Sequence, residues 1–473
     1  MGRLTTRLRE LEIATRPEHP DLTAALAARW AELPAHVKQP NQMLGRRMTG
    51  CEGTHGVFPR CNLACTPCYH AKEANRVAID GDHTEREVDR QMALLRTLRG
   101  PGQNAQLIGG EVTLLSPEDH ARALRAMERH GRKPMSMTHG DFDYGYLQAL
   151  ALDPQTGVPR FKHLAFAAHF DSMMFGRRGI SRPPDEAALN PFRKRFCEMF
   201  ERLEHEHGIT HYLAHNMTVT PRNVDQIEQV VRDCRLMGFS MFSFQPAAFI
   251  GNRNRWKDSY DTLQPDAIWA HIERGAGGRL HHRAEQVGDP RCNRTAHGLH
   301  VGERYVPILD EHDARDASAL HDYVEAFGGM DFDAPDRALV AARTVRAIAG
   351  HPHVLVSGAG WARRLATRAG GLRALRRERV HTITYVMHMF MDAAQVRPAW
   401  ELLERGELSS DPAVRAAQER LQACSYAMAH PDSDRLVPAC AQHSVLDPLE
   451  NQRLQELLPL HPAAGSSADE RLQ

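Results

Sequence analysis

The spacing of hydrophobic and polar positions changes twice along the chain. Through the first 45 or so residues Leu, Ala and Trp30 recur at helical spacing, interrupted by Pro17 and Pro20. From residue 48 to 252, short apolar runs alternate with amphipathic stretches. The apolar runs predict strands at His55–Pro59, Gln106–Ile108, Pro134–Thr138, His163–Ala168, His211–Val219 and Phe239–Phe244. The amphipathic stretches predict helices at Glu85–Leu98, Pro117–His130, Tyr144–Ala151, Pro191–His207 and Val224–Met237.

This alternation of strands and helices predicts an α/β fold. Strands separated by helices form a parallel sheet with right-handed crossovers. Six such units make a partial (β/α)6 TIM-like barrel, whose chemistry is expected at the carboxyl ends of the strands. We therefore expect a helical N-terminal segment (1–45), a core barrel (46–252), a mixed C-terminal extension (253–461) and a disordered, polar tail (462–473).

The predicted strands and helices of the C-terminal extension do not alternate as they do in the barrel. A strand- and loop-rich region is expected from Gly251 to about His312. One further apolar stretch, Thr382–Met391, follows later. Helical patterns cover the rest, at Ala317–Phe327, Asp336–Ala349, Trp361–Arg376, Ala394–Arg405 and Asp411–Gln422. The extension is predicted to cap the mouth of the barrel.

Charge and composition exclude some partners. Lys plus Arg and Asp plus Glu both total 59, so no global charge favours nucleic acid or an anionic membrane. Residues Met1–Glu12 lack the apolar centre of a secretory signal, and no apolar run is long enough for a transmembrane helix. We therefore expect a cytoplasmic protein, in which the nine cysteines are metal ligands or core residues rather than disulfides.

A cysteine triplet follows the first predicted strand: Cys61, Cys65 and Cys68, in the run RCNLACTPCYH. Thiolates are soft ligands that select iron–sulfur clusters, zinc or Cu(I). Three local thiolates would leave one iron of a [4Fe-4S] cluster open for chemistry. Two alternatives remain, a chance trio of buried thiols and a structural zinc site, for which His70 offers a fourth ligand.

The spacing Cys-x3-Cys-x2-Cys after strand one resembles the radical S-adenosylmethionine (SAM) superfamily. The resemblance implies that the triplet holds a [4Fe-4S] cluster and that its open iron binds SAM. One electron then cleaves SAM to methionine and a 5′-deoxyadenosyl radical, which abstracts hydrogen from a substrate. In many members an aromatic residue precedes the third cysteine and packs near adenine. Here Pro67 has that position and Tyr69 follows Cys68, which makes Tyr69 the candidate for this contact.

A glycine pair with an acid, Gly109-Gly110-Glu111, comes at the end of the second predicted strand. Glycine lets a ligand approach the backbone closely, and a carboxylate accepts hydrogen bonds from an ammonium group. This run resembles the Gly-Gly-Glu motif of the same superfamily, which binds the amino group of SAM. The alternative is an ordinary turn between a strand and a helix.

Polar residues also end the later strands. His169 and Asp171 follow the fourth predicted strand, His139 follows the third, and Asn216 lies in the fifth. In the superfamily such positions contact SAM or the substrate, and we expect this first of His169 and Asp171. Turn and cap chemistry is the alternative.

The other six cysteines fall into two groups. Cys197 and Cys234 lie in predicted helices and are expected to be buried structural thiols. The remaining four are expected in loops: Cys292, Cys424, Cys440 and Cys51. Many superfamily members carry an auxiliary [4Fe-4S] cluster in such an extension, and the first three residues are its favoured ligands here. Four independent buried thiols are the alternative.

These motifs together predict a radical SAM enzyme with an unidentified small-molecule or lipid substrate and an electron donor such as flavodoxin or ferredoxin. Short pieces near residues 386–392 and 435–440 resemble tetraether-lipid-synthase-like members, without the rubredoxin-like cysteine pairs of those enzymes. Lipid C–C coupling, peptide or cofactor modification and maturation of another protein all stay open. The rival from another class is a non-enzymatic zinc or iron–sulfur binding module.

Overall fold

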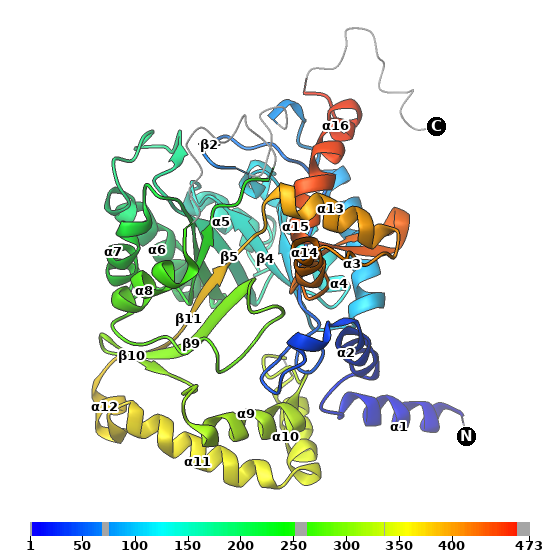
Figure 1. Cartoon of the computed structure of the whole chain (residues 1–473), viewed down its shortest axis with the longest axis vertical. Helices are drawn as coiled ribbons and strands as arrows, with labels where there is room; N and C mark the ends of the chain where they lie inside the picture. The colour runs from blue at the N-terminus through cyan, green and yellow to red at the C-terminus, as the bar shows by residue number, and fades with distance from the viewer. Residues whose placement is uncertain (1, 69–74, 251–262, 335, 461–473) are drawn as a thin grey trace.

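The computed structural model describes residues 2–68, 75–250, 263–334 and 336–460 (Figure 1). Its centre is a curled sheet of eleven strands in the order β10-β9-β11-β8-β7-β5-β4-β3-β1-β12-β13. The strands of the predicted barrel are adjacent and parallel: β1 (Cys51–Gly53), β3 (Asn104–Leu107), β4 (Lys133–Thr138), β5 (His163–His169), β7 (Thr210–Val219) and β8 (Met241–Pro246). The predicted partial TIM-like barrel is confirmed.

Helices connect these strands and cover the outer face of the sheet: α3 (Gly81–Arg99), α4 (Pro117–Arg129), α5 (Tyr144–Ala151), α6 (Asn190–His207) and α7 (Ile227–Cys234). The start of α4 illustrates how the sequence sets their bounds. Ser116 caps it by accepting the Asp119 amide N–H, and Pro117 occupies the first turn, where no backbone donor is needed. Between helices and sheet lies the main core, with Phe166, Phe196 and Phe242 fully buried.

Strands from the C-terminal region extend the sheet at both edges. β11 (Val380–His388) lies parallel to β8, and β12 (Tyr426–His430) lies parallel to β1. Antiparallel strands complete each side: β9 (Asn293–Val301) and β10 (Arg304–Pro307) beyond β11, and β13 (Arg435–Pro438) beyond β12. The last third of the chain therefore supplies neighbours to both the first and the last barrel strand.

Three sequence predictions are wrong. Cys440, expected in a loop, lies in the short helix α15 (Ala439–Ala441). The first strand is Cys51–Gly53 rather than His55–Pro59, so Cys51 lies in the strand instead of in a loop before it. Val57 and Phe58 owe their apolar character to burial in the connection that follows. The region after Gly251 contains a helix, α8 (Pro265–Ala276), that pattern reading missed.

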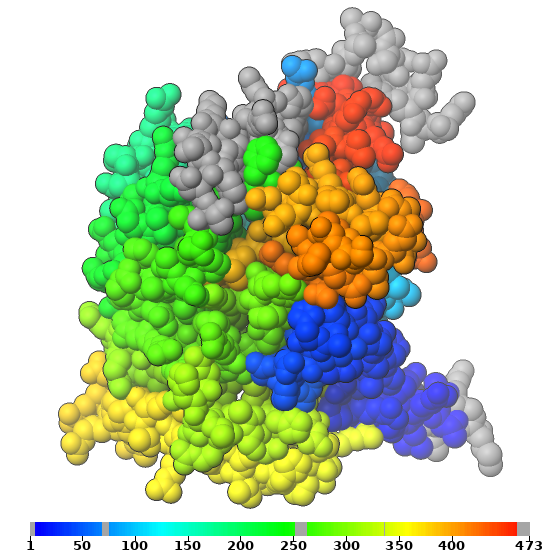
Figure 2. All heavy atoms as spheres, viewed as in Figure 1, coloured from blue at the N-terminus to red at the C-terminus, as the bar shows by residue number. Residues whose placement is uncertain are grey.

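The remaining helices surround the sheet. α1 (Gly2–Ala14) and α2 (Pro20–Glu32) lie beside the arm formed by α9 (Ala314–Phe327), α10 (Arg337–Gly350), α11 (His353–Arg368) and α12 (Gly371–Arg377) (Figure 1). On the β12 side lie α13 (Ala393–Glu404), α14 (Pro412–Gln422), α15 (Ala439–Ala441) and α16 (Asp447–Leu457). Figure 2 shows α13 and α14 packed directly above the N-terminal segment. In the part of the chain that the structure describes, no helix is both long and apolar enough to cross a membrane.

Candidate functional site

The cysteine triplet lies in the loop after β1, and a small second sheet holds this loop in place. Its strands are β2 (Ala64–Cys65) and β6 (Met174–Phe175), which pair antiparallel with Cys65 opposite Met174. Next to this pair, the Thr66 amide N–H donates to the Met173 carbonyl across 3.1 Å. The cysteine loop is thereby fixed to the segment that follows β5, at the carboxyl end of the barrel.

The three thiols are neighbours. The pKa of Cys65 lies well above its usual range because it shares a hydrogen bond with Cys68, is buried, and lies near the negative charges of Cys68, Asp171 and Cys61. Cys65 thus lies beside Cys68, and Cys61 is close enough for its charge to act on Cys65.

His139, at the end of β4, connects the cysteine loop to the barrel. Its Nδ1 accepts the Asp141 amide N–H across 3.0 Å, so the proton is on Nε2, which donates to Oδ1 of Asn62 across 2.7 Å. Burial lowers the pKa of His139, which keeps the ring neutral. Asn62 lies between the first two cysteines, so this bond positions the loop.

The glycine pair faces the segment that leads into the triplet. The Gly110 amide N–H donates to the Phe58 carbonyl across 2.8 Å, and that of Glu111 donates to the Arg60 carbonyl across 2.9 Å. A Cβ at Gly110 would overlap the backbone of Arg60. Glycine is required there because two backbones approach each other without space for a side chain.

The Glu111 carboxylate is only 1% exposed and already accepts several hydrogen bonds. Its Oε1 accepts the Thr113 amide N–H across 3.0 Å and the hydroxyls of Thr113 and Thr138, each across 2.6 Å. Its Oε2 accepts the His139 amide N–H across 2.7 Å. In this structure the carboxylate holds the ends of β3 and β4 together, and its predicted contact with an ammonium group stays a prediction.

The ends of β5 and β7 bring His169 and Asp171 together, while their predicted contact with SAM or substrate stays a prediction. Nε2 of His169 lies 2.9 Å from Oδ2 of Asp171 and 3.0 Å from the Thr218 hydroxyl. Asn216 pairs with His169 in the strand register. Sequence reasoning missed Thr218, whose only signal is its position two residues after Asn216 on the same face of a strand. The predicted contact of Tyr69 lies outside the described residues.

Sequence analysis also missed a buried ion pair between Arg193 and Glu186, next to the segment that precedes β6. The Arg193 guanidinium is fully buried and lies 2.8 Å from Oε2 of Glu186. It also donates to the Phe170 carbonyl across 3.2 Å, while Oε1 of Glu186 accepts the Ser172 amide N–H across 2.7 Å. The pair thus anchors the segment that supports the cysteine loop.

Methionine side chains lie on the inner face of the sheet, together with polar residues such as Gln106 and Ser243. Ser136 points to the outer face, where its hydroxyl lies 2.8 Å from His120 of α4. Because successive strand residues alternate in direction, Met135 and Met137 point inward, and both are only half-buried. Met241, whose neighbour Phe242 is in the outer core, behaves in the same way. These methionines line the interior of the barrel.

A second cysteine group forms at the β12 edge from Cys292, Cys424 and Cys440. The pKa of Cys440 is raised by burial and by the neighbouring thiols of Cys424 and Cys292. Arg420 donates to Sγ of Cys292 across 3.2 Å, although burial still raises the pKa of that thiol to about 11. Three of the four predicted residues therefore lie together.

Cys51 is the fourth residue predicted for this group. It pairs in register with Tyr426, two residues after Cys424. The charges of Cys51 and Cys424 both act on the Tyr426 hydroxyl, whose pKa burial raises well above its usual range. Cys51 therefore adjoins the C-terminal group through Tyr426, from the neighbouring strand.

No family model matches the sequence, and no curated protein matches it. Solved structures do resemble it, and some of them hold bound AdoMet. Native anSMEcpe with bound AdoMet shares 15% identity at a TM-score of 0.33, over 47% of this chain and 57% of that chain. Streptococcus suis SuiB bound to S-adenosylmethionine shares 18% at a TM-score of 0.26, over 43% and 40% of the two chains. The match spans about half the length of the proteins it concerns, and the likeness is one of fold.

Proposed function

We propose that this chain is a radical SAM enzyme, with a [4Fe-4S] cluster on Cys61, Cys65 and Cys68. The observation that carries the proposal is the convergence of these thiols beside Asp171, on a loop fixed to the carboxyl end of a partial barrel. When bound, such a cluster supplies one electron that cleaves SAM to methionine and a 5′-deoxyadenosyl radical.

A structural zinc ion is the alternative, and it would need a fourth ligand beside the three thiols. His70, the conceivable fourth zinc ligand, lies outside the described residues.

The residues around the triplet have distinct parts in this proposal. His139 holds the loop through Asn62, and Glu111 holds the two strand ends beside it. His169 and Asp171 present polar atoms at the next strand ends, where they would contact SAM or substrate. The inward-facing methionines suit a substrate with an apolar part, which keeps lipid C–C coupling among the open reactions.

Anaerobic reconstitution with iron and sulfide tests the proposal. The wild-type chain should show the broad visible absorption of an iron–sulfur cluster, bleach with dithionite and form 5′-deoxyadenosine from SAM. Cys65→Ala should lose all three properties, whereas Cys197→Ala, which removes a fully buried thiol of α6, should keep them. A colourless zinc protein, or deoxyadenosine from the Cys65→Ala variant, would contradict the proposal.

We further propose that Cys292, Cys424 and Cys440 bind an auxiliary [4Fe-4S] cluster, with Cys51 as the adjoining fourth candidate. Arg420 supports this arrangement because its charge favours the thiolate form of Cys292. Full reconstitution should give about eight irons per chain, and Cys440→Ala should reduce this to about four without abolishing deoxyadenosine formation. About four irons in the wild-type chain would exclude the second cluster.

A further inference from the structure

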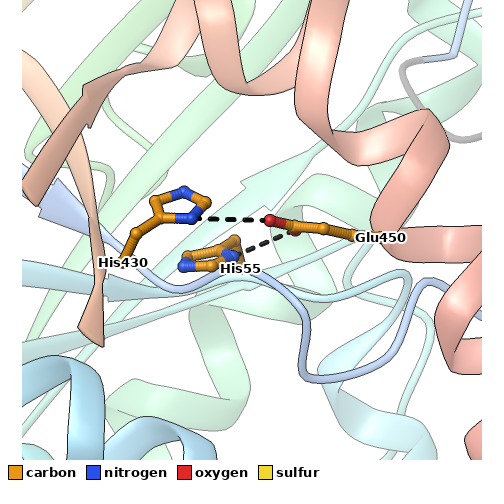
Figure 3. A group of neighbouring side chains, drawn as sticks. All are labelled: His55, His430 and Glu450. Atoms are coloured by element: carbon orange, nitrogen blue, oxygen red, sulfur yellow. Dashed lines mark hydrogen bonds and ion pairs between the residues drawn. The ribbon is translucent and has the colours of Figure 1, made fainter. Parts of the chain in front are cut away.

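Two histidines and a glutamate converge at the β12 edge of the sheet, outside both cysteine groups (Figure 3). His55 follows β1, His430 ends β12, and Glu450 lies in α16. Their ligand atoms all lie within 4.8 Å of one another. Nδ1 of His55 is 3.0 Å from Oε2 of Glu450, and Nδ1 of His430 is 3.7 Å from Oε1 of the same carboxylate.

A hydrogen bond at Nε2 orients each of the two imidazole rings. Nε2 of His55 lies 2.7 Å from the Ala429 carbonyl oxygen, which can only accept, so this nitrogen donates. Nε2 of His430 lies 2.6 Å from Oε1 of Gln442. The Gln442 amide nitrogen donates to Asp447 across 2.8 Å and to Glu450 across 3.0 Å, which fixes its oxygen toward His430. Each ring therefore donates through Nε2 and turns Nδ1 toward the carboxylate.

This is the arrangement of outer contacts that metal-binding histidines use. A ligating imidazole donates its other ring N–H to a carbonyl or carboxylate, which sets the tautomer and aims the lone pair at the ion. The two rings are stacked with centroids 3.8 Å apart and planes 16° apart. Two imidazolium cations would repel each other at that separation, so at least one Nδ1 presents a lone pair to a carboxylate oxygen. A metal cation between such a nitrogen and the carboxylate would be attracted by both.

We propose that His55, His430 and Glu450 bind a divalent first-row transition metal ion. Two imidazole nitrogens and one carboxylate oxygen are a donor set that suits zinc and iron(II) and leaves coordination positions for water or another ligand. The side chains of His55, His430 and Glu450 are 11%, 13% and 19% exposed, so an ion can reach the site from solvent. Gln442 and the Ala429 carbonyl are the positioning groups.

Metal binding here would join segments that are far apart in the sequence. Glu450 is in α16, and the residues after that helix pair with those after the cysteine loop, with Ala78 N–H donating to the Leu458 carbonyl across 2.8 Å. An ion at the site would thus fix α16 to the start of the barrel. The proposal is independent of the proposed function, because none of its ligands belongs to a cysteine group.

Zinc binding by the full-length chain tests the site, by equilibrium dialysis followed by metal analysis. The wild-type chain should bind one more equivalent than Glu450→Gln and His430→Phe, a change that keeps a ring stacked on His55. Affinity at this site should fall by more than about 100-fold in both variants. His205→Gln is the control, because it removes an exposed histidine outside the candidate groups found among the described residues, and it should bind as much zinc as the wild type.

A substitution that keeps all three ligands separates loss of metal binding from loss of folding. Gln442→Met keeps all three ligands and should weaken zinc binding by about 10-fold, with an unchanged circular dichroism spectrum. Equal zinc content and affinity in the wild type, Glu450→Gln and His430→Phe would overturn the proposal. So would a folded Gln442→Met variant with unchanged affinity, because the outer contact would then not orient a ligand.

Discussion

The Nε2–H of His139 donates to the amide oxygen of Asn62 across 2.7 Å, and this bond joins the end of the third barrel strand to the cysteine loop. The β2–β6 pairing and the bond between Cys61 N–H and Asn75 are further contacts that hold this loop. Loss of the bond between His139 and Asn62 should therefore affect how firmly the triplet holds iron.

Asn62→Ala tests this relationship. Removal of the acceptor leaves the buried His139 donor with one long contact to Glu111, at 3.4 Å, and should lower the free energy of unfolding by about 1–2 kcal/mol. A chelator should also remove iron from the variant several times faster. Asn41→Ala, which removes an exposed hydrogen bond to the Arg283 carbonyl, is the control and should behave like the wild type. Identical iron loss in both would contradict the positioning role of His139.

Glu111→Gln should affect both stability and SAM binding. The amide NH2 group would face donors that now bond to a carboxylate oxygen, and the free energy of unfolding should fall by about 2–4 kcal/mol. Affinity for SAM, measured by isothermal titration calorimetry, should fall while iron content is retained. Unchanged affinity in a folded variant would mean that the carboxylate anchors β3 and β4 only.

Breaking the buried ion pair between Arg193 and Glu186 should strongly lower the free energy of unfolding. Glu186→Gln leaves the Arg193 guanidinium buried without its anion and should lower the free energy of unfolding by about 3–5 kcal/mol. Glu198→Gln removes an exposed pair with Lys194 on α6 and should change it by less than about 0.5 kcal/mol. Urea unfolding of both variants measures the difference, and equal effects would contradict the anchoring role of Glu186.

Acid should selectively weaken the turn that carries Cys292. Burial alone would raise the pKa of Asp289, but hydrogen bonds from Arg291 lower it below the usual 3.8. Because the folded pKa is the lower one, the carboxylate stabilises the fold above pH 3.8, and this contribution is lost as pH falls through the folded value.

Asp289→Asn tests that pH dependence. The variant should be about 1–2 kcal/mol less stable than the wild type at neutral pH, because it lacks a charged acceptor for Arg291. Unfolding midpoints in urea, measured at several pH values, should converge for the two proteins as the pH falls below 3.8. A constant difference across that range would show that the charge of Asp289 is not responsible.

The barrel could be predicted from sequence because its signals are local. α5 has the predicted bounds, Tyr144–Ala151, since a helix of this length shows its apolar face within a few turns. β1 could not be placed, because three residues carry too little pattern and the apolar side chains of Val57 and Phe58 lie just beyond them. α8 was missed although Ile268 and Ile272 are spaced as on one helix face.

The candidate sites also differ in how far the sequence alone predicts them. Cys61, Cys65 and Cys68 are close in sequence, so their spacing alone predicts a shared site. Contacts between distant segments have no such signal: nothing in the chain links His55 to Glu450, which are 395 positions apart. The hydrogen bonds that Glu111 accepts from Thr138 and His139 depend on the neighbouring strand, whose register is set by the whole sheet.

The pairing of β12 with β1 also has a consequence for synthesis on the ribosome. β1 is made early, yet its neighbour Tyr426 follows Cys51 by most of the length of the chain. At about 5–20 residues per second, the open edge of β1 stays unpaired for tens of seconds while the rest is translated. An unpaired edge attracts other strands. The nascent chain should therefore depend on chaperones until its last strands emerge, and a chain cut at residue 252 should aggregate.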